Sequence, residues 1–219
     1  MKKILNLMFL SVLFISCGTT QQVTRGEQYE KLYNESPTSI LVMPPINNTN
    51  NVDAKDYFYT SLTRPLIEKG YYVFPPYLVL DLLQQESAYD SELFIDGDLS
   101  TFREVFMTDA GLFTVINTWQ KQMERITAEI EYILKSAVTY EVLYKKRGYI
   151  EIRLDSSNNE GLAYLLSVIT HASTPIITAA RKCNAYVFRD LPLGPYSPAF
   201  LNDKDYFVDQ EYIRVVENN

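Results

Sequence analysis

The stretch that decides the fold spans residues 126–144 and reads ITAEIEYILKSAVTYEVLY. Apolar side chains occupy its even-numbered positions, with Ser136 as the interruption, while most odd-numbered positions are polar. A period of two residues is typical of a strand that has one face in a core and the other in water. The pattern predicts a long antiparallel strand with its even-numbered side chains buried, and with a bend near residues 135–137.

The neighbouring segments extend this strand into a sheet. Residues 112–119 form an apolar run that precedes it, and residues 149–154 form another that follows it. Between them, Lys145-Lys146-Arg147-Gly148 has the composition of a tight turn. The three segments together predict an antiparallel meander.

The first half of the domain predicts a β-α-β unit. A short apolar run at residues 38–43 stops at Pro44-Pro45, and a second run at 71–74 stops at Pro75-Pro76. Residues 54–69 between them suit a helix that Asp53 caps and that Pro65 kinks or divides. We expect residues 46–52 to form an asparagine-rich loop.

Further helices are predicted before and after the meander in the sequence. Residues 77–85 and 101–109 precede it, the latter with a capping box formed by Thr101 and Glu104. Residues 160–172 and 175–184 follow it. The fold class is therefore α/β, with a mixed sheet that combines a β-α-β unit with an antiparallel meander and is packed by helices.

The N-terminus has the layout of a secretory signal peptide. Lys2 and Lys3 precede an apolar run of about a dozen residues, which is too short to span a bilayer. Cys17 directly follows the small residue Ser16, as in the bacterial lipobox, in which the cysteine is acylated. An ordinary signal peptide with a chance cysteine is the alternative. We expect a signal at residues 1–16, a flexible tether at 17–36, and a single domain at 37–219.

Composition narrows the classes of partner. The formal net charge of −7 disfavours nucleic acid and peripheral binding to anionic lipid, so membrane attachment would depend on the acyl chains of Cys17. Cys183, the second of two cysteines, would then lack a disulfide partner; a buried apolar role and a catalytic thiol are its two interpretations. The 17 tyrosines favour a protein with contact surfaces.

Catalytic patterns are weak or absent in the sequence. His171 is the single histidine, no phosphate-binding or nucleophile-elbow motif occurs, and Asp96-Gly97-Asp98 lacks the other ligands of a calcium loop. Glu129 and Glu131 share one strand face, where a solvated pair is the simpler interpretation. We therefore expect no enzymatic activity, no catalytic residues, no metal and no cofactor other than the covalent lipid.

Several blocks resemble a bacterial family of lipoproteins without an assigned biochemical function. They are residues 40–49 (ILVMPPINNT), 65–75 (PLIEKGYYVFP), 109–113 (DAGLF) with Trp119, and 193–198 (LGPYSP). The resemblance covers about residues 38–200 and departs from the family pattern at 144–149, where YKKRGY replaces a Thr-Gly-Glu turn followed by Leu-Trp.

The resemblance implies a fold similar to the N-terminal domain of TolB and residence at the outer membrane, facing the periplasm. It also implies an accessory role in envelope assembly or export beside a CsgG-like lipoprotein, with other envelope proteins as partners. A small-ligand-binding module and an enzyme acting on an envelope polymer remain alternatives. The residues expected to bind a partner lie in the proline- and tyrosine-containing loops: Pro44, Pro45, Pro75, Pro76, Gly194, Pro195 and Tyr196. We expect all three loops to meet at the carboxyl edge of the parallel strands.

Overall fold

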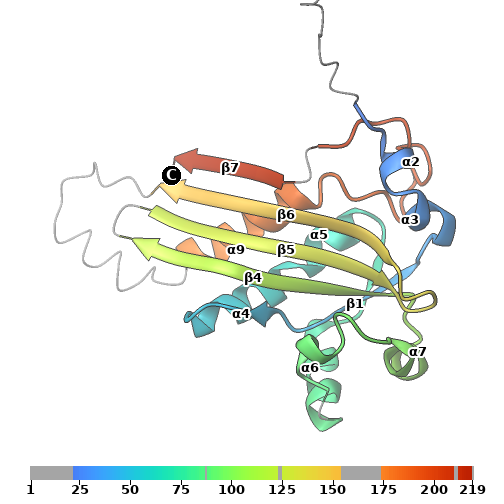
Figure 1. Cartoon of the computed structure of the whole chain (residues 1–219), viewed down its shortest axis with the longest axis horizontal. Helices are drawn as coiled ribbons and strands as arrows, with labels where there is room; N and C mark the ends of the chain where they lie inside the picture. The colour runs from blue at the N-terminus through green and yellow to red at the C-terminus, as the bar shows by residue number, and fades with distance from the viewer. Residues whose placement is uncertain (1–21, 87, 123–124, 154–173, 210–211, 219) are drawn as a thin grey trace, which may run out of the picture.

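The computed structural model describes residues 22–86, 88–122, 125–153, 174–209 and 212–218. Its centre is one mixed sheet in the order β3-β1-β4-β5-β6-β7, with β2 paired to β4 beside this path (Figure 1). The predicted α/β class with a mixed sheet and packed helices is confirmed. The strands are β1 (Ser39–Val42), β2 (Ile46–Asn47), β3 (Tyr72–Val73), β4 (Ala110–Gln122), β5 (Arg125–Ser136), β6 (Val142–Arg153) and β7 (Tyr212–Asn218).

The β-α-β unit is present as predicted. β1 and β3 pair in parallel, and the connection between them contains α4 (Val52–Ser61) and α5 (Thr63–Glu68). The helical segment is divided at Leu62, three residues before Pro65, because a proline cannot donate the hydrogen bond that would continue the first helix. Asn51, rather than Asp53, caps α4 by accepting the N–H of Ala54 at 3.1 Å.

Pro44-Pro45 ends β1, but the chain continues to pair with β4 after the two prolines. Met43 donates its N–H to the carbonyl of Leu112 at 2.9 Å, and Asn48 donates to that of Ile116 at 3.0 Å. Ile46–Asn47 between these contacts forms β2, although a loop was expected there. The two prolines lack N–H groups, so pairing stops at them and resumes afterwards.

The meander of β4, β5 and β6 is antiparallel throughout, as predicted. In β5 the even-numbered side chains from Ile126 to Leu134 are buried. Glu131 on the opposite face pairs with Lys145 at 3.1 Å, so the predicted register of this strand is confirmed.

The expected single strand over residues 126–144 is wrong, because the chain turns back after Ser136. The Ser136 hydroxyl accepts the N–H groups of Val138 and Thr139 at 3.0 and 2.9 Å, which favours a turn over an extended chain. Tyr140 adopts a left-handed φ of 62° in this turn. Val138, Tyr140 and Val142 continue the apolar alternation but are exposed.

The expected turn at Lys145–Gly148 is also wrong, since these residues lie inside β6. Gly148 marks a close approach of α9 (Thr174–Val187) to the sheet: a Cβ there would lie 2.6 Å from Cγ2 of Val187. A glycine in the middle of a strand therefore accommodates helix packing.

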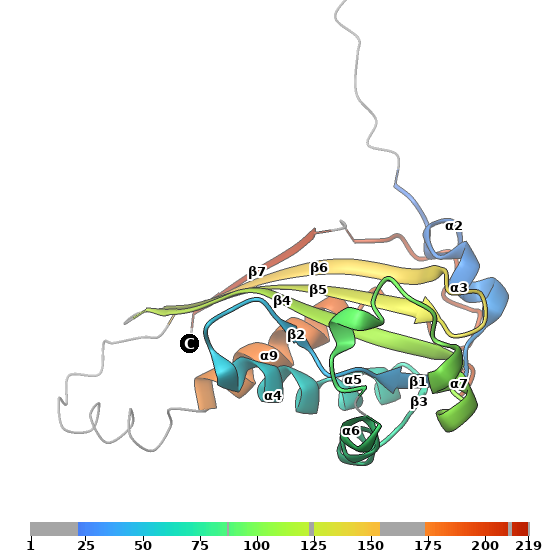
Figure 2. The same cartoon turned by 60° about the horizontal axis from the view of Figure 1, so that its bottom comes forward.

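Helices cover the two faces of the sheet unequally. α4, α5 and α9 pack on one face, and Figure 2 shows α4 and α9 lying along it. The buried cluster on this side is called the main core; it includes Ile40, Val42, Phe58, Leu62, Leu66, Leu112, Ile116, Ile126, Ile130, Tyr132, Leu134, Tyr144, Ile150, Cys183, Val187 and Phe188.

α6 (Pro76–Gln85), the 3-10 helix η2 (Ser91–Leu93) and α7 (Ser100–Phe106) cover part of the other face. The cluster beneath them is called the small core; it consists of Leu41, Met43, Val79, Leu83, Leu99, Phe102, Phe113, Ile133 and Ala137. The expected capping box of α7 is not formed, because Leu99 occupies the N-cap position without a side-chain hydrogen bond. The predicted helix at 160–172, with His171, lies outside the described residues, whereas the helix predicted at 175–184 corresponds to α9.

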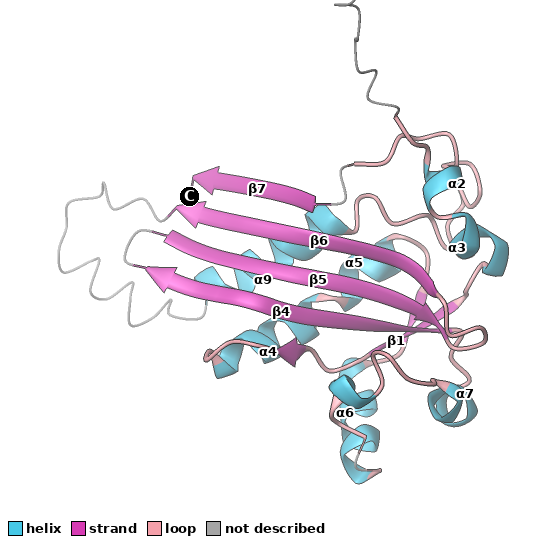
Figure 3. Ribbon diagram, in the orientation of Figure 1, coloured by secondary structure: helices cyan, strands magenta, loops and turns pink. Residues whose placement is uncertain are grey.

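Residues 24–36 belong to the folded domain, which corrects the expectation of a tether extending to residue 36. They form α2 (Arg25–Gln28) and α3 (Glu30–Glu35), beside the turn between β5 and β6 (Figure 3). Tyr29, Leu32 and Tyr33 are buried in the main core. Thr24 and Glu27 form a capping box that begins α2. Because most residues of this segment are polar, the sequence did not indicate that these three side chains anchor it to the domain.

Candidate functional site

The expected lipid-bearing residue, Cys17, lies outside the described residues. The chain is described from Gln22 and pairs at once with the C-terminal part of the domain. Thr24 forms an antiparallel bridge with Phe207, and Val208 donates its N–H to the carbonyl of Val23 at 2.9 Å. This part of the domain is therefore built from the first described residues together with residues 206–208 of the C-terminal loop.

Two of the three expected partner-binding blocks share one edge of the sheet. Pro44 and Pro45 follow β1 and are buried, and the carbonyl of Pro44 accepts the hydroxyl of Ser91 at 2.6 Å. Pro75 follows β3 and is exposed, and Pro76 is half-buried at the first position of α6, where a proline is well tolerated. Since β1 and β3 are parallel, their carboxyl ends meet at this edge, as predicted.

The third block lies at the opposite edge, so the expectation that all three meet is wrong. Gly194 donates its N–H to the carbonyl of Lys69 at 2.8 Å, and Tyr196 donates to that of Gly70 at 3.0 Å. Both acceptors precede β3. Gly70 has a left-handed φ of 87°. A Cβ on Gly194 would lie 2.5 Å from the carbonyl oxygen of Gly70. Gly194-Pro195 thus packs on Gly70, while the side chain of Tyr196 stays 66% exposed.

A buried ionic network beside the N-terminal segment was missed by sequence reasoning. Asp190, just after α9, accepts hydrogen bonds from the ammonium of Lys146 on β6 and from the hydroxyl of Tyr29 at 2.7 Å. The side chains of Asp190 and Lys146 are each 1% exposed. Such a pair is destabilising unless both charges are fully hydrogen-bonded. Lys146 meets this need by donating also to the carbonyl of Asp209 at 2.9 Å.

Arg25 connects this pair to a second buried carboxylate. Its guanidinium donates to Asp203 at 3.1 Å and to the carbonyl of Arg189 at 2.7 Å, and its Nε lies 3.5 Å from Asp190. Asp203 also accepts the hydroxyl of Tyr33 at 3.0 Å and the N–H of Leu193 at 3.0 Å. The network joins α2, α3, β6 and the C-terminal loop. We call Arg25, Lys146, Asp190 and Asp203 with their tyrosines the buried ionic network.

Burial also shifts titrations around the network. Desolvation lowers the pKa of Lys69 to about 8, and the positive charge of Arg25 adds to this effect. Desolvation, with the negative charge of Asp190, raises the pKa of Tyr29 far above its usual range. The tyrosines are therefore neutral hydrogen-bond donors, which is a structural role.

Two pockets lie away from the proline-containing loops, which the alternative of a small-ligand-binding module would use. A pocket of about 460 Å³ beside the network is lined by Arg25, Lys69, Arg189, Tyr206 and neighbouring residues. A second pocket, of about 540 Å³, lies between the 48–51 loop and residues 117–121 of β4. Neither contains a residue from the three predicted blocks.

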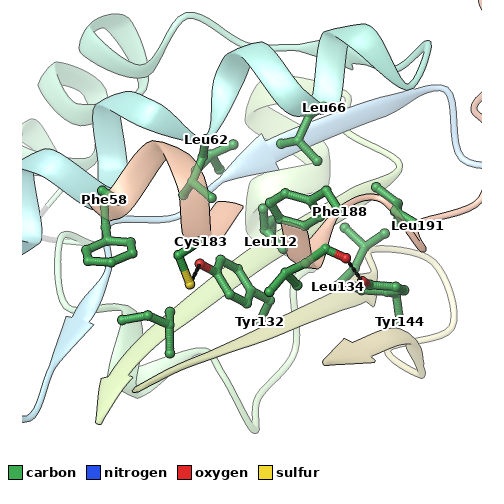
Figure 4. Packing of buried hydrophobic residues seen from close by; sticks show 14 of the residues in the cluster. Phe58, Leu62, Leu66, Leu112, Tyr132, Leu134, Tyr144, Cys183, Phe188 and Leu191 are labelled. Atoms are coloured by element: carbon green, nitrogen blue, oxygen red, sulfur yellow. Dashed lines mark hydrogen bonds between the residues drawn. The ribbon is translucent and has the colours of Figure 1, made fainter. Parts of the chain in front are cut away.

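Cys183 has the environment of a structural thiol. It is 2% exposed in the main core, where the Tyr132 hydroxyl lies 3.4 Å from its Sγ (Figure 4). Burial raises its pKa to about 12, so the reactive thiolate is suppressed at neutral pH. The same hydroxyl donates to Asn184 at 2.6 Å, and Asn184 in turn donates to Ser61 of α4 at 2.9 Å. This chain of polar contacts joins β5, α9 and α4.

The other acidic candidates also have structural explanations. Glu131 pairs with Lys145 and lies 3.6 Å from Arg147. Asp98 accepts the N–H of Ser100 at the start of α7, and Asp96 beside it is exposed. Across the described residues, no group of three or more His, Cys, Asp or Glu side chains could hold a metal ion. Within the same residues, no helix has the length and apolar character needed to cross a membrane.

Sequence signals for the buried ionic network were indirect. Lys146 lies in a segment that was predicted to be a turn, and Arg25 lies in one that was predicted to be a tether. Asp190 lies more than 40 residues from Lys146 in the sequence. The sole local hint was Tyr29 and Leu32-Tyr33, whose apolar bodies are spaced for one face of a helix. Their spacing identifies a packed segment but not its ionic partners.

Comparison with known proteins identifies relatives of this fold. The family model described as "Putative lipoprotein GNA1162-like" matches residues 27–185. A Neisseria meningitidis serogroup B (strain MC58) protein described as "Putative lipoprotein NMB1124/NMB1162" is 24% identical over 206 residues, covering 92% of this chain and 95% of the relative. Neither description names an enzymatic activity.

A solved structure of a GNA1162 lipoprotein agrees with this chain at the level of the fold. The crystal structure of lipoprotein GNA1162 from Neisseria meningitidis is 24% identical, with a TM-score of 0.50, over 64% of this chain and 99% of that chain. PelC from Paraburkholderia phytofirmans is more distant, with 11% identity and a TM-score of 0.42, over 68% of this chain and 85% of that chain. Because the family model matches most of the sequence, this chain belongs to the GNA1162-like family of lipoproteins.

Proposed function

We propose that this protein is anchored by lipid on Cys17 to the outer membrane, faces the periplasm, and acts there as a non-enzymatic accessory in envelope assembly or export. A CsgG-like lipoprotein is the proposed partner. The observation that carries the proposal is that the chain belongs to a lipoprotein family and that Cys17 directly follows a short apolar run with the layout of a signal peptide. The structural environments of Cys183 and of the acidic side chains agree with a binding role.

Anchoring through acyl chains suits the composition of the domain. The chain is acidic overall, so it has no electrostatic attraction to anionic lipid. A single acyl chain gives weak, reversible attachment, and stable attachment needs at least two. The protein would therefore depend on the lipid of Cys17 to remain at the membrane.

Labelling with radioactive palmitate and separation of the membranes test the anchor. Wild-type protein should incorporate label and sediment with the outer membrane. Cys17→Ala should lose both properties, whereas the matched variant Cys183→Ala should keep both. Palmitate incorporated into Cys17→Ala, or wild-type protein found in the soluble fraction, would contradict the anchor.

Crosslinking in intact cells tests the accessory role. Tyr196 and Pro75 are the exposed members of the predicted partner-binding blocks and lie at opposite edges of the sheet. We expect a CsgG-like lipoprotein among the captured partners, and a lower yield from Tyr196→Ala. The matched control is Tyr212→Ala, another exposed tyrosine, on β7 and outside the predicted blocks. An unchanged yield from Tyr196→Ala would remove this loop from the proposed interface.

A further inference from the structure

The N-terminal segment and the C-terminal loop form a short ribbon with exposed apolar side chains. Val23 and Thr24 pair with Phe207 and Val208, and Arg25 donates its N–H to the carbonyl of Tyr206 at 2.8 Å. Tyr206 is 62% exposed, Phe207 59% and Val23 38%. We call Val23, Tyr206 and Phe207 the ribbon patch.

The ribbon patch is fixed to the domain. The guanidinium of Arg25, which is held by Asp203 and the carbonyl of Arg189, lies 5.6 Å from the centre of the Tyr206 ring. Val208 packs against the main core. The aromatic side chains are thus presented outward on a rigid base, at little further cost in conformational entropy.

The length of chain before the patch limits its distance from Cys17. Five residues separate Cys17 from Val23, so the two are six residue steps apart, and a fully extended chain of that length spans at most about 22 Å. A cysteine whose acyl chains enter the hydrocarbon layer lies at the membrane surface, so the patch would be held close to that surface.

Charge near the patch indicates which contact is possible. Lys204 and Arg189 are exposed, and Lys69 lines the pocket that Tyr206 and Phe207 also line, but the exposed carboxylates of Glu68, Asp205 and Asp209 lie beside the same residues. Arg25 is already paired with buried aspartates. The patch therefore has no excess of positive charge, and contact with a bilayer would be apolar and interfacial. Aromatic side chains are enriched at that depth in membranes.

We infer that the ribbon patch inserts into the lipid–water interface of the bilayer that carries Cys17, and so fixes the orientation of the domain on the membrane. The inference rests on the proposed lipid anchor. Its occupant is a bilayer surface, chosen because the short link to Cys17 brings the patch to that surface. The ribbon patch is a second membrane contact, made by side chains instead of acyl chains.

Tryptophan fluorescence in vesicles tests this contact. The full-length lipidated protein is reconstituted into phosphatidylcholine vesicles that contain lipids with a doxyl quencher on the acyl chain. The single native tryptophan, Trp119, is buried and supplies a constant background. Phe207→Trp places a probe in the patch, and Tyr77→Trp places a matched probe on α6, where Tyr77 is 73% exposed.

We expect acyl-chain doxyl groups to quench the Phe207→Trp variant at least twofold more than the Tyr77→Trp variant, with no change on adding salt. Equal quenching of the two variants, or quenching that salt abolishes, would overturn the inference. A Phe207→Trp signal that changes only when a CsgG-like lipoprotein is added would identify a protein interface and would also overturn it.

Sedimentation of the same vesicles separates this inference from the anchor. Wild-type protein that does not sediment with vesicles contradicts the anchor and the inference together. Protein that sediments without selective quenching of Phe207→Trp contradicts the inference alone. The double variant Tyr206→Ser with Phe207→Ser should still sediment, because its acyl chains remain, and should show the same melting temperature as the wild type since both side chains are exposed.

Discussion

The main core and the small core lie on opposite faces of the same strands and are enclosed in different ways. The main core is closed by α4, α5 and α9 and by the buried ionic network, which connects α2 and α3 to β6 and to the C-terminal loop. The small core is closed by short helices, and exposed apolar side chains surround it. These are Tyr77, Leu78, Leu82, Leu93, Val105 and Met107.

This difference suggests how stability is distributed. Segments with few buried contacts open locally at a lower free energy than the global unfolding. α7 has seven residues, and Met107, its C-cap residue, adopts a left-handed φ of 53° and is exposed. We therefore expect the α6–α7 side to open before the main core, and the segment nearest to Cys17 to be among the most stable parts.

A charge placed in the main core should have the largest effect. Ile130 is fully buried, so Ile130→Asp should lower the free energy of unfolding by about 4 kcal/mol or more. Glu131→Lys, one residue away on the solvated face, should cost about 1 kcal/mol or less. Chemical denaturation measures both. Equal losses would show that the register of β5 is wrong.

Breaking the buried ionic network should have the next largest effect. Asp190→Asn removes the charge that balances Lys146 and Arg25, and should cost about 3 kcal/mol. The exposed Asp205→Asn is the matched control and should change the stability very little. If both variants unfold at the same denaturant concentration as the wild type, the network does not close the main core.

Truncating one leucine on each face compares the two cores directly. Leu62 and Leu83 are both buried, in the main and the small core respectively. Leu62→Ala should cost about 3–4 kcal/mol and Leu83→Ala about 2 kcal/mol, because the small core can relax around a cavity. A larger loss from Leu83→Ala would reverse the proposed order of the two cores.

The smallest effect concerns the pH dependence of stability. The pKa of Lys69 is lowered to about 8 in the folded state, below the ordinary value near 10.5. Between these values the unfolded chain binds more protons, so this group makes stability rise with pH, by at most about 1.4 kcal/mol per unit. Cys183 and the buried tyrosines, whose pKa values are raised, act in the opposite direction over this range, so the wild type is compared with Lys69→Met. In denaturation at pH 8.0 to 9.5, the stability of the wild type should rise relative to that of Lys69→Met. A difference between the two proteins that does not change with pH would contradict the lowered pKa of Lys69.

Much of the fold could be predicted from local patterns. The alternation in residues 126–134, the β-α-β unit and the segment that forms α9 were each visible in apolar spacing or in proline positions. The end of β5 was not, because Val138, Tyr140 and Val142 kept the alternation while a serine hydroxyl turned the chain. β7 was also missed, since it forms by parallel pairing with β6 in a tail rich in proline and aspartate.

The candidate sites were harder to predict, because they depend on contacts between distant segments. Gly194 packs on Gly70 at the amino edge of the strands, and no local pattern specifies that contact. Lys146 and Arg25 are polar residues whose buried partners lie far away in the sequence. Lipid attachment at Cys17, by contrast, rests on a purely local signal and stays a prediction.

Hydrogen exchange of individual backbone amides is the most direct test of whether residues 24–36 are part of the stable domain. We expect the amides of Tyr33 and Ser36, which donate to Tyr29 and Leu32 at 3.1 and 2.8 Å, to exchange as slowly as those of β5. The amide of Val79 in α6 should exchange faster. If Tyr33 and Ser36 exchange as fast as Val79 or faster, the N-terminal segment is a tether and the buried ionic network does not fix it.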